Sequence, residues 1–285
     1  MVDLQLKTRD VIVDQKKHGA DYYDIQQADD FADANAYSMW VNKGTYAGFT
    51  VSTNNAHIFC APGVVITGAI TLSGTGIKLF VGGQSDLQGL VTLSGANGGL
   101  VCGAGVDGVG ISVSAADCFI DGGGHDTLMN GGTTRHGIAV YGTRCIVQHI
   151  AVQTTAGGAS GYDGLQVLSY GTFATLRGIR VVDSDDAGIV LHTDGCVVGS
   201  VIENSDGHSI QVNGPRNRII GNYGLSAGDD GIALLAQSND SVVVGNTIKD
   251  TTGNAIEVNI NGEDCCVVGN RVDGVVVDNS VTSTV

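Results

Sequence analysis

A short strand-like motif recurs along the chain at a nearly constant interval, and this repeat restricts the possible folds more than any other feature. The motif reads as a polar residue, Gly or another small residue, and three residues typical of a strand, with steps of 21 to 27 residues between copies. Its central apolar residues are Ile138, Leu165, Ile189, Ile210, Ile232 and Ile256. A second motif, two apolar residues followed by Gly and Ser or Asn, keeps the same interval. Two interleaved strand series with a common period indicate a solenoid of stacked coils.

Equivalent strands in successive coils would form parallel sheets, with neighbouring coils about 4.8 Å apart. The two-residue period of a strand turns Ile232 and Leu234 inward and Gly231 and Ala233 outward. Less regular copies of the pattern continue toward the N-terminus. We therefore predict an all-β chain with one right-handed parallel β-helix over residues 45–285, preceded by an N-terminal segment over residues 1–44.

A short capping helix is predicted inside the N-terminal segment. Asp24 is a good N-cap residue, Gln27 stands at the third helical position, and Ala28 and Phe31 give one apolar face. Such a helix would cover the first coil, because a solenoid exposes core at both ends. The segment after residue 275 shows no comparable cap, which suggests a chain trimmed at this end or a last coil that meets a partner subunit, possible in a homotrimer.

The charge of the chain excludes one large class of partner. It carries 29 acidic against 14 basic residues, and its formal net charge is −15. A surface of this charge repels phosphate backbones, so we expect no binding to nucleic acid. There is no apolar stretch long enough to span a membrane and no signal peptide is visible. We expect an extracellular or virion-surface protein that reaches its location by another route.

The seven cysteines match neither a zinc site nor a disulfide framework, so no metal is predicted. Four of them open an apolar triplet, which suggests a shared inward position where Cys acts as a small apolar side chain. These are Cys118, Cys145, Cys196 and Cys266. The aromatic residues Tyr22, Tyr23, Trp40 and Tyr46 are expected to pack in the N-terminal cap rather than to form a platform for sugars.

Three features resemble the superfamily of pectate-lyase-like right-handed β-helices, which includes polygalacturonases, polysaccharide lyases and phage tailspike depolymerases. The predicted helix is followed by Val41-Asn-Lys-Gly-Thr-Tyr46, which is similar to the N-terminal signature of that superfamily, and the Val-Val-Gly-Asn coils are similar to its repeat. Gly228-Asp-Asp-Gly-Ile-Ala233 resembles a polygalacturonase motif that carries paired aspartates. The matching histidine and arginine motifs of polygalacturonases are missing, which argues against pectin hydrolysis itself.

Carboxylates in neighbouring coils are the candidate catalytic groups. Asp186, Asp206, Asp229 and Asp230 stand at related positions of successive coils, so we expect them along one edge of a sheet. Paired carboxylates shift each other's pKa and can divide the roles of general acid and base in glycoside cleavage. Candidate substrate-binding residues nearby are His192, His208, Gln211, Arg216 and Glu257. The alternative is structural, because Asp beside Gly is also typical of tight turns.

Three functions remain open on this basis. The leading hypothesis is a depolymerase of the glycoside hydrolase type, which needs no cofactor. A second is a non-catalytic module that binds cell-surface glycans or forms part of a viral or phage surface fibre. A third is a polysaccharide lyase, which would need a Ca ion or Arg to neutralise a uronate and a basic side chain to remove a proton; no Lys occurs between Lys78 and Lys249.

Overall fold

The computed structural model describes residues 10–15, 22–31, 38–124, 127–131, 135–154, 161–168, 171–235, 237–259 and 263–279. These residues form three parallel sheets, A, B and C. Sheet A holds twelve strands: β1 (Asp10–Val13), β2 (Ser38–Val41), β5 (His57–Cys60), β8 (Lys78–Val81), β11 (Gly99–Cys102), β14 (Phe119–Asp121), β17 (Ile146–Gln148), β20 (Thr175–Arg177), β23 (Cys196–Val198), β26 (Arg218–Ile220), β29 (Val242–Val244) and β32 (Cys266–Val268).

Sheets B and C hold eleven strands each. Sheet B consists of β3 (Thr45–Tyr46), β6 (Val65–Ile66), β9 (Asp86–Leu87), β12 (Asp107–Gly108), β15 (Leu128–Asn130), β18 (Ala151–Gln153), β21 (Arg180–Ser184), β24 (Val201–Ser205), β27 (Tyr223–Ala227), β30 (Thr247–Lys249) and β33 (Arg271–Val272). Sheet C consists of β4 (Phe49–Val51), β7 (Ile70–Leu72), β10 (Val91–Leu93), β13 (Ile111–Val113), β16 (Ile138–Val140), β19 (Leu165–Val167), β22 (Ile189–Leu191), β25 (Ile210–Val212), β28 (Ile232–Leu234), β31 (Ile256–Val258) and β34 (Val276–Asp278).

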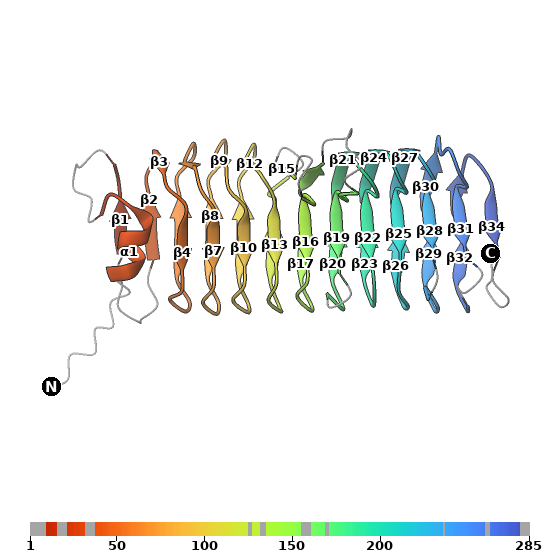
Figure 1. Cartoon of the computed structure of the whole chain (residues 1–285), viewed down its shortest axis with the longest axis horizontal. Coiled ribbons are helices and arrows are strands. Elements are labelled where there is room, and N and C mark those ends of the chain that lie inside the picture. The colour runs from red at the N-terminus through yellow and green to blue at the C-terminus, as the bar shows by residue number, and fades with distance from the viewer. Residues whose placement is uncertain are drawn as a thin grey trace.

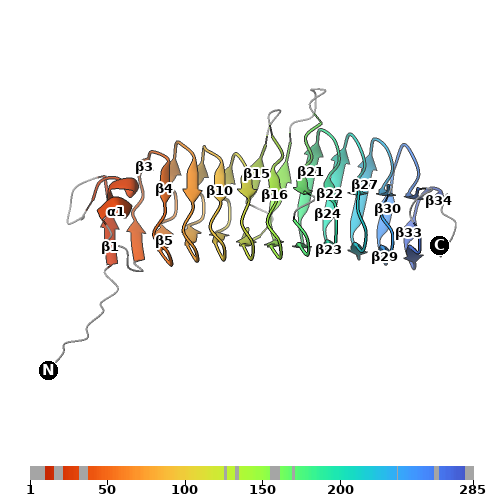
Figure 2. The same cartoon turned by 60° about the horizontal axis from the view of Figure 1, so that its bottom comes forward.

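Each coil runs through sheets A, B and C in turn, and successive coils stack into an elongated solenoid (Figures 1 and 2). The prediction of a single all-β parallel solenoid is confirmed. Sheet A starts at β1, so two of its strands precede residue 45; the boundary between the two predicted segments stays a prediction. No helix in the part of the chain that the structure describes has the length and apolarity to cross a membrane.

Rows of aliphatic side chains fill the inside of the solenoid. Residues that pair between coils have the same orientation, so Ile189, Ile210 and Ile232 of sheet C form one continuous buried row. Sheet A contributes a similar row through Val197 and Ile219. Each inward residue therefore packs on its equivalents above and below, which is the packing unit of such a repeat.

The turn from sheet B to sheet C needs a residue without a side chain where a β-branched residue of sheet B comes close. A Cβ on Gly137 would overlap Cγ1 of Val152, and a Cβ on Gly164 would lie 2.6 Å from Cγ1 of Val181. Ser209 occupies the position of Gly188 in the next coil. There a side chain fits, because the facing residue of sheet B is Gly224. The small residue of the repeat is thus selected by close packing against sheet B.

Asparagines form a hydrogen-bonded ladder inside the turn from sheet A to sheet B. The backbone N–H of Asn222 donates to Oδ1 of Asn246 (2.8 Å), and that of Asn246 donates to Oδ1 of Asn270 (2.9 Å). The Asn246 amide also donates to the carbonyl oxygen of Ile219 (2.9 Å). These contacts satisfy polar groups that would otherwise be costly to bury, which explains the recurring Asn of the second motif.

The predicted common position of the four cysteines is wrong by one residue for two of them. Cys118 and Cys145 are buried and immediately precede the strands β14 and β17, whereas Cys196 and Cys266 begin β23 and β32 and are half-buried on the outer side. The inward position equivalent to Cys118 is held in the last coil by Cys265, which is buried. The inward residue lies in the turn before the strand, so the apolar triplets were matched in the wrong register.

The helix α1 (Ile25–Phe31) lies at the N-terminal end of the stack (Figure 1). The backbone N–H of Gln26 donates to Oδ1 of Asp24 (2.7 Å), as expected of an N-cap residue. The Gln26 side chain accepts a hydrogen bond from the backbone N–H of Thr50 in β4 (2.7 Å). The helix thus contacts the first strand of sheet C, and its role in capping the fold stays a prediction.

The close packing at the turn can be tested by a double-mutant cycle. Gly137→Ala should lower the free energy of unfolding by about 1–3 kcal/mol, because the added methyl overlaps Val152. Combining it with Val152→Ala should cost less than the sum of the two single changes, measured as midpoints of urea denaturation. Ala255→Gly is the control at a position that already carries a Cβ. Strict additivity would contradict this account of the glycine.

Candidate functional site

Polar side chains gather in the turns that join sheet B to sheet C, which we call the B–C corner. Residues 185–188, 206–209 and 228–231 form equivalent four-residue turns, because Ser184, Ser205 and Ala227 are paired before them and the sheet C strands are paired after them. His208 and Asp230 therefore occupy the same position of successive coils. The predicted placement of the aspartates along one sheet edge holds in outline, but they divide into two groups.

The first group contains His208, Asp229 and Asp230. The backbone N–H of Asp230 donates to Nδ1 of His208 (3.2 Å), whose Nδ1 also lies 3.6 Å from Oδ2 of Asp230. With Nδ1 as acceptor, a neutral His208 carries its proton on Nε2, which lies 3.9 Å from Oδ2 of Asp229. The Asp230 side chain is buried and accepts a hydrogen bond from the backbone N–H of Asn254 (2.6 Å), while that of Asp229 is 60% exposed. Asp229 is thus the carboxylate that meets solvent.

Glu257 of β31 joins this group from the next coil. A hydrogen bond to Asp230, together with burial and repulsion by Asp230 and Asp229, raises the pKa of the Glu257 carboxyl. Asn254 donates to Oε2 of Glu257 (3.4 Å). A shared proton between two carboxyl groups is the arrangement expected when one of them is held neutral beside an ionised partner. Glu257 can therefore carry a proton at a pH where an isolated glutamate has lost it.

The same group has the composition of a cation site. Ligand atoms of His208, Asp229 and Asp230 all lie within 4.8 Å of one another. Imidazole with two carboxylates suits first-row transition metals, whereas Ca²⁺ prefers a shell made of oxygen atoms. Because the Nδ1 atom of His208 already accepts a backbone hydrogen bond, Nε2 would have to serve as the nitrogen ligand.

A second group lies three coils toward the N-terminus and was missed by the sequence analysis. The backbone N–H of Asp163 donates to Nδ1 of His136 (3.0 Å), and Oδ2 of Asp163 lies 3.5 Å from the same nitrogen. Asp186 acts electrostatically on both residues, and the ring of Tyr162 packs edge-on against His136 with the centroids 5.4 Å apart. Asp186 therefore belongs with His136 and Asp163 rather than with Asp229.

Burial favours a neutral contact over an ion pair between His136 and Asp163. Burial lowers the pKa of His136, partly offset by its hydrogen bond to Asp163 and by Asp186. Burial and repulsion by Asp186 raise the pKa of Asp163 to about 7, although the Ala187 backbone N–H acts in the opposite direction. Both shifts favour the uncharged forms of the two side chains.

The other predicted site residues are spread around the two groups. Asp206 is exposed and occupies the turn position that Asp185 occupies in the preceding coil. Asp186 and Asp229 share the next position of the turn. Gln211 faces outward on β25 and donates to Oδ1 of Asn213 (2.9 Å). It flanks Ala233, which points outward as predicted and is nevertheless buried.

His192 and Arg216 lie at the opposite end of the sheet C strands. His192 directly follows β22 and is half-buried, which lowers its pKa. Arg216 occupies the turn from sheet C to sheet A and makes a bidentate ion pair with Asp194, with Nε–Oδ1 and Nη2–Oδ2 distances of 2.7 and 2.8 Å. The structure does not bring Arg216 together with the carboxylates, and its predicted role in substrate binding stays a prediction.

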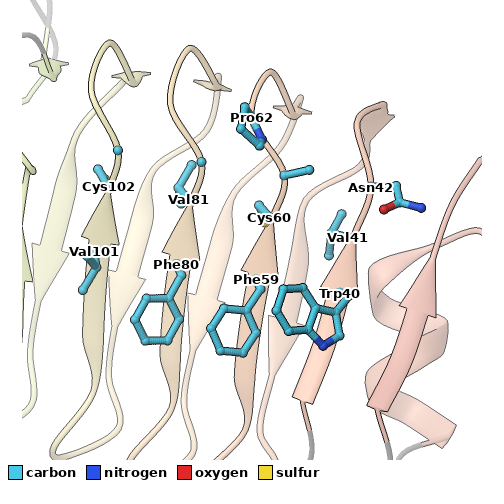
Figure 3. Close-up of a pocket in the computed structure, with 13 residues that line it drawn as sticks. Trp40, Val41, Asn42, Phe59, Cys60, Pro62, Phe80, Val81, Val101 and Cys102 are labelled. Atoms are coloured by element: carbon cyan, nitrogen blue, oxygen red, sulfur yellow. The ribbon is translucent and has the colours of Figure 1, made fainter.

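An aromatic row lies on the outside of sheet A (Figure 3). Trp40 stacks on Phe59 with centroids 4.6 Å apart, and Phe59 stacks on Phe80 at 4.7 Å. The row borders an apolar groove of about 520 Å³ that ends near Val101. Phe59 has a stacked ring on each side, so the row forms a stacked ladder on the outside of sheet A. Trp40 is 48% exposed and lies in this ladder; Tyr46 is buried as predicted.

Comparisons with known proteins agree with the geometry of the solenoid. The family model described as right handed beta helix region matches residues 106–285. None of the curated proteins matches this chain in sequence. Among solved structures, alginate lyase from Paenibacillus sp. str. FPU-7 gives a TM-score of 0.59 at 16% identity, covering 91% of this chain and 96% of the lyase.

Two further structures share the fold. The A-module of the mannuronan C-5 epimerase AlgE4 from Azotobacter vinelandii gives a TM-score of 0.56 at 12% identity, with 92% of this chain and 94% of the module covered. A mutant tailspike protein of E. coli bacteriophage HK620, in complex with a pentasaccharide, gives 0.52 at 13% identity and 91% coverage of this chain. This chain spans about half of the tailspike, 54% of its length. Likeness at these identities concerns the fold.

Asp163 makes stability depend on pH in a direction that can be tested. The folded chain holds its proton up to about pH 7, whereas the unfolded chain releases it near about pH 4, so this group stabilises the folded state less as pH rises between these values. In Asp163→Asn, the free energy of unfolding should therefore fall less over this pH range, by up to about 4 kcal/mol. Urea denaturation at about pH 5 and about pH 8 measures it, with the exposed Asp206→Asn as control. Identical pH dependence of wild type and Asp163→Asn would contradict the assignment.

Proposed function

This chain belongs to the right handed beta helix family, and we propose that it cleaves a polysaccharide by carboxylate acid/base catalysis at the B–C corner. The observation that carries the proposal is the contact of Glu257 with Asp230 beside Asp229 and His208. A carboxyl with a raised pKa next to an exposed carboxyl provides the two groups that glycoside cleavage requires. The position on the outer surface of a regular scaffold leaves this corner open to a long substrate.

The proposed roles follow from exposure and hydrogen bonding. Glu257, whose pKa is raised, would protonate the leaving oxygen as the general acid. Asp229, which is exposed, would act as the base that activates water or as the nucleophile. His208 and the buried Asp230 would orient these two groups. This differs from the role first expected for Glu257, because substrate binding alone does not use a proton shared with Asp230.

The known activities of similar proteins support a polysaccharide as substrate or ligand. The structures that share the fold are named as an alginate lyase, a mannuronan epimerase and a tailspike in complex with a pentasaccharide. A location outside the cell or on a virion surface, and a homotrimer of the kind first considered, are compatible with the tailspike likeness. Both belong to the proposal.

A non-catalytic glycan-binding module is the second candidate. It is favoured by the tailspike, which is in complex with a pentasaccharide and of whose length this chain spans 54%. A binding module would retain affinity for a glycan after the carboxylates are neutralised and would release no products. The same assays therefore separate the two functions.

Neutralising the proposed acid and base should abolish cleavage without loss of folding. Asp229→Asn and Glu257→Gln should each lower the rate by about 10²- to 10⁴-fold, the typical contribution of a positioned acid or base. Neutral and acidic polysaccharides are incubated with the protein and assayed for new reducing ends and for unsaturated products, which mark a lyase. Asp194→Asn, in the turn far from the corner, is the control. Equal rates for wild type and Asp229→Asn would show that the site is misassigned.

The pH profile should report the proton on Glu257. Because the raised pKa keeps this carboxyl protonated at higher pH than usual, the rate should fall on the alkaline side as the proton is lost. Asn254→Ala removes a hydrogen bond that favours the ionised form, so it should shift the alkaline limb to higher pH. The measurement is kcat/KM as a function of pH. An unshifted limb in Asn254→Ala would argue that another group titrates.

A further inference from the structure

We propose that His136, Asp163 and Tyr162 form a distal binding subsite of the same corner, which takes a sugar unit of an uncharged polysaccharide several units away from the cleavage point. This inference rests on the proposed function, because it assumes that the B–C corner binds a glycan. The subsite would bind and position the chain and would not perform chemistry.

The subsite repeats the backbone arrangement of the proposed catalytic group. In each, a histidine is followed one coil later by a buried aspartate whose backbone N–H donates to Nδ1 of that histidine, at 3.0 Å for His136 and 3.2 Å for His208. In each, the aspartate interacts with the backbone N–H of the equivalent residue in the next coil, Ala187 or Asn254. The chain therefore builds the same polar unit twice at one corner.

The two units face the same direction and are separated along the solenoid axis. His136 and His208 occupy the same position before paired strands of sheet C, with three coil steps between them. At about 4.8 Å per coil the separation is about 14 Å, which corresponds to the length of a few sugar units. A glycan lying along the axis can therefore contact both units at once, whereas a disaccharide cannot.

The groups at the distal unit suit hydroxyl recognition. Burial favours the neutral form of His136, and the half-buried Tyr162 presents an aromatic ring with a hydroxyl at its tip. The buried Asp163 holds His136 in place through its backbone N–H. Neutral donors and acceptors of this kind exchange hydrogen bonds with sugar hydroxyls, and the aromatic ring adds apolar contact. Val190 stands where Glu257 stands in the catalytic unit, so the counterpart of that partly exposed carboxyl is missing there.

The charge between the two units selects against uronates. Asp186, Asp206 and Asp229 present carboxylates along the corner, and Arg135 supplies the positive charge among the described residues of these turns. Lys249 lies beside the corner at the end of β30. An anionic chain along this path would meet several like charges, whereas an uncharged chain would meet none. The substrate class inferred here is therefore a neutral polysaccharide.

The test compares short and long oligosaccharides by isothermal titration calorimetry and by KM. The probes are di- to octasaccharide ladders of uncharged glucose, mannose, galactose and N-acetylglucosamine polymers, and a ladder of oligouronates. His136→Ala and Tyr162→Ala should weaken binding of long uncharged chains, and raise their KM, by about tenfold, with unchanged kcat and unchanged binding of the shortest chains. Asp117→Asn, whose carboxylate pairs with Arg144 in the turn from sheet C to sheet A, is the matched control.

Each result decides between the two proposals. If wild type cleaves a glycan and both distal variants retain full affinity for its long oligomers, the subsite is overturned and the proposed function stands. If wild type binds without cleavage and the distal variants lose the length-dependent affinity, the subsite stands and the cleavage proposal fails. Oligouronates that bind as tightly as uncharged chains at low salt would overturn the substrate class. A complete lack of binding across the ladders overturns both proposals.

Discussion

The register between coils is the constraint on which the rest of this molecule depends. Backbone hydrogen bonds between parallel strands hold equivalent residues about 4.8 Å apart, so every side chain meets its counterparts above and below. A buried polar group can then be satisfied by another of its own kind, as Asn222 is by Asn246 and Asn246 by Asn270. The same register turns one histidine and the following aspartate into a hydrogen-bonded pair. A residue type that recurs at one position of the repeat therefore forms a row of neighbouring side chains along the solenoid.

This register explains why the fold is readable in the sequence and why some details are not. The rows through Ile189, Ile210 and Ile232 keep a regular spacing, and that spacing alone predicts the parallel sheets. The cysteines were misaligned because the inward position of sheet A begins in the preceding turn, where no sequence signal separates Cys265 from Cys266. The strand period also predicts that Ala233 points outward, but it does not predict that Ala233 is buried, because its exposure depends on the larger side chains of Gln211 and Glu257 on either side.

The candidate site was recoverable in part for the same reason. Asp229, Asp230 and His208 lie in short turns of equal length, so their proximity follows from counting residues. His136 and Asp163 open two copies of the same repeat, two residues before Ile138 and Leu165, so the spacing predicts their proximity as well. They were missed because no pair of adjacent aspartates marks these turns as a site. Arg216 was grouped with the carboxylates on sequence proximity to Asp206, yet each coil carries the chain through a full circuit. Ten residues of separation can therefore place two side chains at opposite ends of one strand.

Two units with the same backbone arrangement need not have the same chemistry, and the difference lies in their neighbours. At the second unit, Glu257 reaches Asp230 and Asp229 faces solvent, so a carboxyl with a raised pKa stands next to an exposed one. At the first unit, the corresponding positions hold Val190 and Tyr162, and burial together with repulsion by Asp186 raises the pKa of Asp163 to about 7. The carboxyl that keeps its proton at this unit is thus the buried Asp163, which can hold His136 in place but cannot reach a glycosidic oxygen. A repeated scaffold can thus provide recognition at one coil and chemistry three coils away with only a few substitutions.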